Sequence, residues 1–259
     1  MKPIKITQEK TKYYAADLAK MYGLHPNTIR QYEKLGYISQ VQRNTNQYRM
    51  FEELHVLQLK ICRCIFGYPF TNRRIRNAGN EILWAIAKKQ WDAARQYTDC
   101  YVNIIEHEIE TAQNAALMLR NWAIPTECKG NRFEVKTITR KETADYLGVT
   151  VETVRNWERN SLITSAGVGG KGETLYLNTD LGRMCVIFML LQSGYSVASI
   201  HRSISMYDKG FMELVTPALN TPEQDELVSV GDRWLYELNK LMKASQKIPQ
   251  IIEEIKLYI

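Results

Sequence analysis

The sequence repeats one motif at a constant spacing, and this limits the possible folds more than any other feature. Gly23, Thr28, Arg30 and Glu33 recur 125 residues later as Gly148, Thr153, Arg155 and Glu158. A second pair of segments, Leu54 to Gly67 and Leu181 to Gly194, repeats at an offset of 127. The later copy therefore holds two extra residues between the two motifs. An internal duplication of this kind predicts two similar domains in one chain.

Each copy of the motif has the pattern of a helix-turn-helix. In the first copy, Gly23 ends a helix with one apolar face and Pro26 begins the next, as is typical of helix ends and starts. In the second copy, Thr139 and Glu142 have capping-box spacing, and Thr150 caps the second helix. Two short helices joined by a tight turn are typical of a unit that places its second helix in the major groove of DNA.

A polar segment after each helix pair predicts a β-hairpin wing. In the first copy this segment runs from Gln42 to Arg49. In the second copy it is the glycine-rich run from Gly167 to Tyr176, which we interpret as longer by the two extra residues, with Tyr176 at the position of Arg49. An apolar-periodic helix is expected after each wing, over residues 52–66 and 180–193.

These segments resemble the winged helix-turn-helix of the mercury-resistance (MerR) regulator family. The resemblance is carried by Thr28-Ile-Arg-Gln-Tyr-Glu-Lys-Leu-Gly-Tyr-Ile38, by Tyr48-Arg-Met-Phe51 and by Gly67-Tyr68. It covers residues 12–78 and, in a more divergent form, 137–203, where Trp157 replaces the tyrosine and Asn160-Ser161 replaces Leu-Gly. The expected fold is mainly α with small β wings: tandem winged helix-turn-helix domains joined by long coiled-coil-type helices.

Each domain is followed by a predicted long helix. Residues 79–125 form a linker and a dimerisation-type helix, whose apolar positions follow heptad steps: Val102, Ile105, Ile109, Ala112, Ala116 and Leu119. An amphipathic helix over 224–250 repeats this feature within a C-terminal segment, 223–259, that ends in an apolar tail. Single-copy members of the family dimerise through such helices, so this chain could pair its two helices internally as a monomeric pseudo-dimer. A homodimer is the alternative.

DNA contacts are expected from the start of each second helix and from each wing. By resemblance, the candidate residues are Asn27, Thr28, Arg30, Tyr32, Arg43 and Arg49 in the first copy, and Thr153, Arg155, Trp157 and Lys171 in the second. Each has a structural alternative: the helix arginines could pair with Glu33 or Glu158, the polar residues could cap the helix, and the aromatic residues could belong to the core. The wing arginines have little to pack against in a hairpin, whereas a duplex offers them phosphates.

Composition agrees with this interpretation without establishing it. The chain has 34 Lys and Arg against 28 Asp and Glu, a net charge of +6 that suits a polyanionic partner. Five cysteines at irregular spacing contain no CxxC pair, so we expect structural thiols and no metal or cofactor, with a metal or redox sensor as the alternative. No nucleophile motif or phosphate-binding glycine loop indicates an enzyme. The sequence lacks a signal peptide and a long apolar run, which predicts a cytoplasmic, nucleoid-associated protein without a membrane partner.

The predicted function is sequence-specific regulation of transcription. The chain would bind an imperfect palindrome in double-stranded DNA and distort the promoter, and the resemblance implies RNA polymerase as a second partner. The alternative is an architectural or DNA-anchoring protein with one DNA-reading domain and one protein-interaction domain. A second wing without the arginine favours this alternative.

Overall fold

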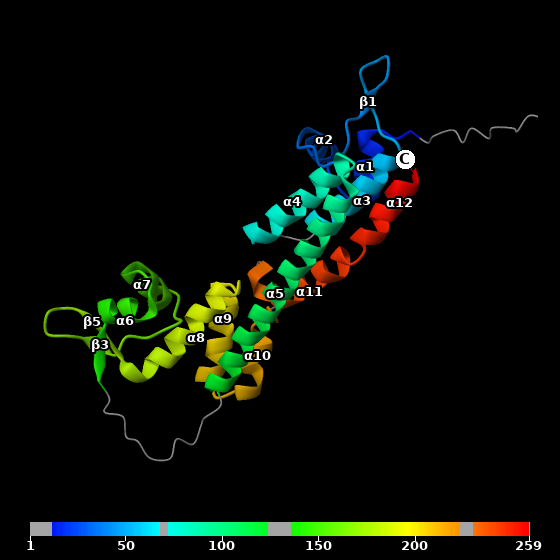
Figure 1. Cartoon of the computed structure of the whole chain (residues 1–259). Helices are drawn as coiled ribbons and strands as arrows, with labels where there is room; N and C mark the ends of the chain where they lie inside the picture. The colour runs from blue at the N-terminus through cyan, green and yellow to red at the C-terminus, as the bar shows by residue number, and fades with distance from the viewer. Residues whose placement is uncertain (1–11, 68–71, 124–135, 223–229, 259) are drawn as a thin grey trace, which may run out of the picture. The chain divides into compact units, whose positions relative to one another are not determined.

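The computed structural model describes residues 12–67, 72–123, 136–222 and 230–258. The chain divides into two compact units: a first unit of Met1–Glu106 with Asn239–Ile259, and a second unit of His107–Leu238. Both are mainly helical with a small antiparallel sheet, as predicted (Figure 1). Tyr68 and Cys128, together with residues 124–125 and 223–229 of the predicted helical segments, lie outside the described residues.

The helix-turn-helix of the first unit consists of α1 (Ala15–Tyr22) and α2 (Pro26–Lys34). Gly23 ends α1 in the left-handed conformation, with a φ of 61°, and the next N–H, that of Leu24, donates to Ala19 O at 2.8 Å. Glycine adopts this conformation without the steric cost that a side chain brings. Helix α2 then begins with Pro26 in its first turn and with His25 Nδ1 accepting from the Asn27 N–H.

The wing and two further helices complete this winged helix-turn-helix fold. Strands β1 (Gln42–Arg43) and β2 (Arg49–Met50) pair antiparallel, and Tyr13 forms a bridge to Phe51 beside them. Helices α3 (Glu53–Phe66) and α4 (Arg73–Ala87) follow. The core lies beneath α2 and the wing, and its fully buried side chains include Leu18, Ile29, Phe51, Leu59 and Ile65.

The second unit repeats these elements with one more strand. Its sheet has the order β3-β5-β4, from β3 (Thr137–Thr139), β4 (Gly167–Val168) and β5 (Thr174–Leu177). Its helix-turn-helix is α6 (Arg140–Leu147) and α7 (Val151–Arg159), followed by α8 (Leu181–Gln192) and α9 (Val197–Asp208). The predicted caps are present: Thr139 and Glu142 form a capping box, Gly148 is left-handed, and Thr150 caps α7.

The register of the two wings corrects the sequence alignment of this segment. Arg43 pairs with Arg49 in the first wing, and Val168 pairs with Thr174 in the second, so both hairpins enclose loops of equal length. The second wing is therefore not longer, and Thr174 rather than Tyr176 corresponds to Arg49. The two extra residues fall after β5, where Asn178–Asp180 form a short 3₁₀ turn before α8.

The C-terminal segment forms two helices instead of the single predicted one. After two 3₁₀ turns (Met212–Leu214 and Val230–Arg233) and the short α10 (Val215–Ala218), α11 runs from Trp234 to Ser245 and α12 from Ile248 to Tyr258. Pro249 explains the interruption, because it has no N–H to donate to the carbonyl of Ser245 and its ring would clash there.

Helix α12, which follows the second copy in sequence, packs in the first unit along α3 (Figure 1). Ile248, Ile251, Ile252 and Ile255 are almost completely buried, at 0–2% exposure. Ion pairs flank this apolar stripe: Lys60 Nζ lies 3.3 Å from Glu254 Oε2, and Arg95 Nη2 lies 2.5 Å from Glu253 Oε1.

The long helix α5 (Trp91–Ala123) follows the first copy, yet its part from His107 onward belongs to the second unit. There Tyr195 Oη donates to Ala112 O at 3.3 Å, and the rings of Trp122 and Tyr207 lie 4.3 Å apart. Of the predicted heptad positions, Ile105, Ala112, Ala116 and Leu119 are buried, and Val102 and Ile109 are half-buried. Each unit thus contains a helical segment that follows the other copy in the sequence.

Candidate nucleic-acid interface

The exposed side of α2 is polar and basic. Asn27, Arg30 and Lys34 are exposed and Thr28 is half-buried, whereas Ile29 is fully buried and anchors the opposite side of the helix. Arg30 Nη1 donates to Asn27 Oδ1 at 2.7 Å, so this arginine pairs with a neutral amide and keeps its full charge available. The predicted alternative, an ion pair between Arg30 and Glu33, is wrong, because Glu33 is bound by the wing.

Glu33 attaches the first wing to α2. Its carboxylate forms an ion pair with Arg49 Nε on β2, and its other oxygen accepts from the Val41 N–H at 3.4 Å. Arg43, opposite Arg49 in the hairpin, is exposed and donates to Gln47 O at 3.2 Å. One wing arginine therefore fixes the hairpin against α2, and the other is free to meet a ligand.

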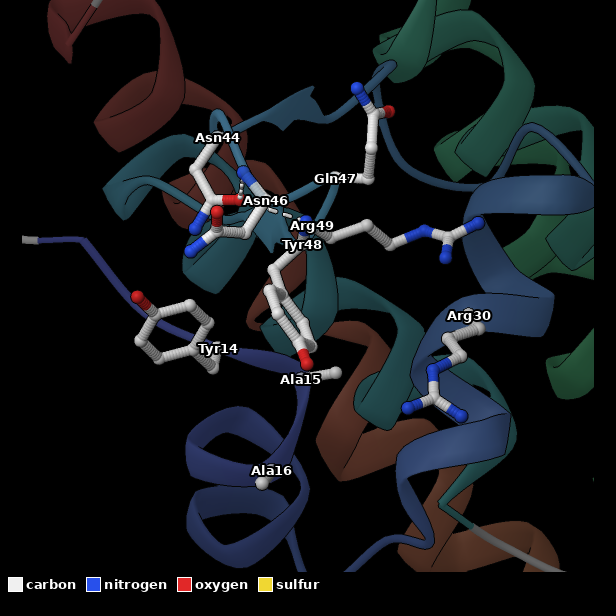
Figure 2. Close-up of a pocket in the computed structure, with 9 residues that line it drawn as sticks. All are labelled: Tyr14, Ala15, Ala16, Arg30, Asn44, Asn46, Gln47, Tyr48 and Arg49. Carbon is white, nitrogen blue, oxygen red and sulfur yellow. Dashed lines mark hydrogen bonds between the residues drawn. The ribbon is translucent and has the colours of Figure 1, made fainter.

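Between these elements lies a groove of about 710 Å³. Its lining consists of Tyr14, Ala15 and Ala16 at the start of α1, Arg30 on α2, and the wing residues Asn44, Asn46, Gln47, Tyr48 and Arg49. Figure 2 shows these side chains around the groove, with Arg30 approaching from α2 and the wing on the other side. These lining residues contribute two guanidinium groups, amides and phenols, and no acid. Such a surface suits the phosphates and sugars of a nucleic-acid backbone.

A further basic cluster was not found by sequence reasoning. Arg73, Arg74 and Arg76 lie in the first turns of α4, and all three are exposed. Cations are unfavourable near a helix N-terminus, because the backbone dipole is positive there. In the sequence, the run Arg73-Arg-Ile-Arg76 directly after the capping residue Asn72 could have indicated this basic cluster. These arginines are additional candidates for phosphate contacts.

The corresponding surface of the second unit has a different charge pattern. Glu152 occupies the position of Asn27, and its carboxylate accepts from Arg155 Nη1 at 2.5 Å and from Arg159 Nη2 at 2.7 Å. Thr153 is half-buried, and its hydroxyl lies 2.8 Å from that of the capping residue Thr150. The exposed side of α7 is therefore still basic, but one acid neutralises part of its charge.

The second wing offers fewer cations. Lys171 is exposed at its tip, and its backbone N–H donates to Glu173 Oε2 at 2.9 Å. Glu158, which corresponds to Glu33, is held by Arg140 Nη2 at 2.5 Å and by Tyr176 Oη at 3.1 Å. An arginine at the start of α6 thus provides the attachment that Arg49 provides in the first unit.

The two predicted aromatic contacts lie in the core or at its edge. Trp157 is only 2% exposed. Tyr32 is half-buried in a ring cluster, with centroids 5.9 Å from Tyr37 and 5.8 Å from Phe66, and burial raises its pKa to about 12. Its core position excludes the Trp157 ring as a DNA contact, and its packing stabilises α7. Tyr32 is only partly buried and stays a predicted DNA contact.

The Cys62 and Cys64 thiols and the Trp84 indole have structural surroundings, whereas the Cys100 thiol is exposed. Burial raises the pKa of the Cys62 and Cys64 thiols, which keeps them protonated and unreactive. Trp84 Nε1 donates to Leu35 O at 3.0 Å, which ties α4 to the end of α2. Within the described part of the chain, no group of three His, Cys, Asp or Glu side chains could hold a metal ion. Nor does any helix there have the length and apolar character needed to cross a membrane.

Comparison with known families agrees with this geometry in both units. Residues 15–51 match the MerR family regulatory proteins, and residues 138–207 match the MerR HTH family regulatory proteins. The first match contains α1, α2 and the first wing, and the second covers all but the first residue of the sheet and all but the last residue of helices α6 to α9. Searches of curated proteins and of solved structures found no match.

Proposed function

The chain belongs to the MerR family of DNA-binding transcriptional regulators through both of its helix-turn-helix regions, and we propose that it binds DNA as an intrachain pseudo-dimer. In this proposal α2 and α7 enter the major groove at two half-sites of one operator, and the wings contact the flanking phosphates. Because the two recognition surfaces differ in sequence, the operator is an imperfect palindrome.

The observation that carries this proposal is the reciprocal packing of the long helices. The first unit includes α12, which follows the second copy, and the second unit includes the end of α5, which follows the first copy. A single-copy regulator needs a partner chain to supply such a segment. Here one chain supplies both, so a monomer buries the apolar faces that would otherwise demand a homodimer.

We also propose that binding distorts the promoter and that RNA polymerase at the promoter is the second partner. Two DNA-binding domains joined through helices bind both half-sites only where the DNA between the half-sites can bend or twist to match the domains. The energy of this deformation depends on sequence, so it adds selectivity at base pairs that the protein does not touch.

A protection experiment on DNA selected from a random pool tests the pseudo-dimer. We expect the wild-type chain to protect two half-sites whose centres lie about 34–36 Å, or a multiple of this, apart. Arg30→Ala should weaken protection in one half-site and Arg155→Ala in the other, because each arginine extends from a different recognition helix. Arg120→Ala, which removes an exposed charge from α5, is the matched control. Protection of a single half-site by the wild-type chain would contradict the proposal.

The charge pattern of the second unit favours the alternative of a DNA-anchoring protein with one reading head. Glu152 binds both Arg155 and Arg159, and the second wing has no arginine in the place of Arg49. Under this alternative the second unit binds another protein. The same protection experiment distinguishes the two functions, because Arg155→Ala would then leave the footprint and the affinity unchanged.

A further inference from the structure

Asn27 and Glu152 occupy the same place in the two recognition helices. Each is the second residue of its helix, after Pro26 in α2 and after Val151 in α7, and each is exposed. Each also receives a hydrogen bond from the arginine three residues later. The N-terminal residues of a recognition helix are those that reach base edges in the major groove.

Neither side chain is needed to cap its helix. In α2 the side chain of His25 accepts the Asn27 N–H, and in α7 the Thr150 hydroxyl accepts the Thr153 N–H at 3.1 Å. The amide of Asn27 and the carboxylate of Glu152 therefore extend from the helix start and accept no capping hydrogen bond from a backbone N–H. Their polar atoms are available to a ligand in the groove.

The chemistry of the two groups differs in a way that bases can distinguish. The amide of Asn27 offers a donor and an acceptor, which matches N6 and N7 of adenine. The carboxylate of Glu152 only accepts, which matches the N4 amino group of cytosine. Arg155 and Arg159 offset its negative charge, so that it can approach DNA without net repulsion. Each carboxylate oxygen keeps a lone pair for the base.

We infer that this position determines half-site specificity, with Asn27 selecting adenine in one half-site and Glu152 selecting cytosine at the equivalent place in the other. The inference rests on the proposed function, since it requires both helices to read DNA. The competing explanation is that Glu152 only stabilises the positive end of α7, where an acid is favourable. That role predicts no base preference.

An exchange of the two residues tests the inference. Binding sites are selected from random DNA with the wild-type chain, with Asn27→Glu, with Glu152→Asn and with the double exchange, all at one salt concentration. Asn27→Glu should change adenine to cytosine in one half-site, and Glu152→Asn should change cytosine to adenine in the other. Base pairs elsewhere in each half-site, away from the exchanged residue and its arginine partner, should not change, which makes them an internal control.

Competition between duplexes that differ only at this base pair gives the size of the effect. We expect each variant to prefer its new base by about 5- to 150-fold, the range of one good contact between a side chain and a base edge. Glu152→Ala should lose the cytosine preference without gaining another. This preference is a ratio at constant salt, so it is independent of the added affinity that comes from removing an acid.

The outcomes separate the inference from the proposed function. Two half-sites with the same base at this position, or bases that do not follow the exchange, would overturn the inference and leave the pseudo-dimer intact. A wild-type site with a single half would overturn the proposed function and the inference with it. Thermal unfolding of each variant shows whether the fold is retained.

Discussion

At the scale of single residues, the two copies attach the second helix of the helix-turn-helix to neighbouring structure by the same kind of ion pair, but with different side chains. Glu33 and Glu158 are equivalent acids on the two recognition helices, and each is bound by an arginine. In the first unit this arginine comes from the wing, as Arg49, and in the second from α6, as Arg140. Both pairs join the recognition helix to neighbouring structure, so a second wing without the arginine does not leave Glu158 unpaired.

Loss of the Glu33 carboxylate should destabilise the first unit. The pair with Arg49 is largely shielded from water, with side-chain exposures of 28% for Arg49 and 14% for Glu33. Glu33→Gln should lower the free energy of unfolding by about 1–2 kcal/mol, between the values for exposed and buried pairs. Urea denaturation measures this change. Glu152→Gln, in an exposed pair, should cost less than about 1 kcal/mol; an equal cost for both would contradict the role given to Glu33.

His55 should make the stability depend on pH. It is 5% exposed in α3, its Nδ1 accepts from the Glu52 N–H, and burial lowers its pKa below the ordinary value of about 6.5. As pH falls below 6.5 the unfolded chain takes up a proton that the folded protein resists, so stability falls, by at most about 1.4 kcal/mol per pH unit.

Urea denaturation between pH 5 and 7.5 checks this prediction. His55→Gln keeps a polar side chain that does not titrate, so its stability should decrease less than that of the wild type between pH 6.5 and 5. Carboxylates titrate in both proteins and cancel in the difference. Parallel pH profiles would show that His55 is not responsible.

At the scale of elements, the start of α11 is held by close contacts with the second unit. In the second unit the indole of Trp234, at the start of α11, covers Gly194, which ends the turn after α8 with a φ of 96°. In the same region Asp232 accepts from the Ser196 hydroxyl and forms a buried ion pair with Arg202. This combination holds the start of α11 on the second unit.

Gly194→Ala should disrupt this contact. A Cβ at this position would lie 2.6 Å from two atoms of the Trp234 ring, and the left-handed backbone adds strain. We expect a loss of more than about 2 kcal/mol in the free energy of unfolding. Gly210→Ala is the matched control, since Gly210 has a φ of 82° but open space around it, and should cost only about 1 kcal/mol. Chemical denaturation of both variants, followed by Trp fluorescence, measures the difference.

The elements that sequence predicted well are those determined by neighbouring residues. The left-handed glycines, the capping box at Thr139 and the helix-turn-helix pairs depend on contacts within a few residues. The register of the wings depends instead on long-range pairs, such as Tyr13 with Phe51 and Ile138 with Tyr176, which motif spacing does not reveal. The burial of Trp157 likewise depends on what the fold places opposite it, whereas Pro249 was a visible signal for the break between α11 and α12.

At the scale of the whole molecule, the duplication places two different copies of one domain in a single chain, whereas a homodimer would contain two identical copies. The same fold occurs twice, and each unit receives a helical segment from beyond the other copy. The recognition surfaces have diverged, with Asn27 and two wing arginines in the first unit and Glu152 and Lys171 in the second. One chain therefore presents two unlike helix-turn-helix surfaces, which a homodimer of identical chains cannot do.

Salt dependence should reveal whether both wings contact phosphates. Each neutralised phosphate contributes about 0.9 to the slope of log affinity against log salt. Arg43→Ala and Lys171→Ala should each reduce this slope by about one, and Lys243→Ala, an exposed charge on α11, should not. Fluorescence anisotropy over a range of salt concentrations measures the slopes. An unchanged slope for Lys171→Ala would mean that the second wing does not touch DNA.

The most direct test of the intrachain pseudo-dimer is the mass of the protein, free and bound to its selected duplex, by light scattering coupled to size-exclusion chromatography. An intrachain pseudo-dimer should give a free species of 30.1 kDa and a complex in which one chain occupies one duplex with both half-sites. A free species of twice that mass, or two chains on each duplex, would show that two chains associate and would contradict the intrachain pseudo-dimer.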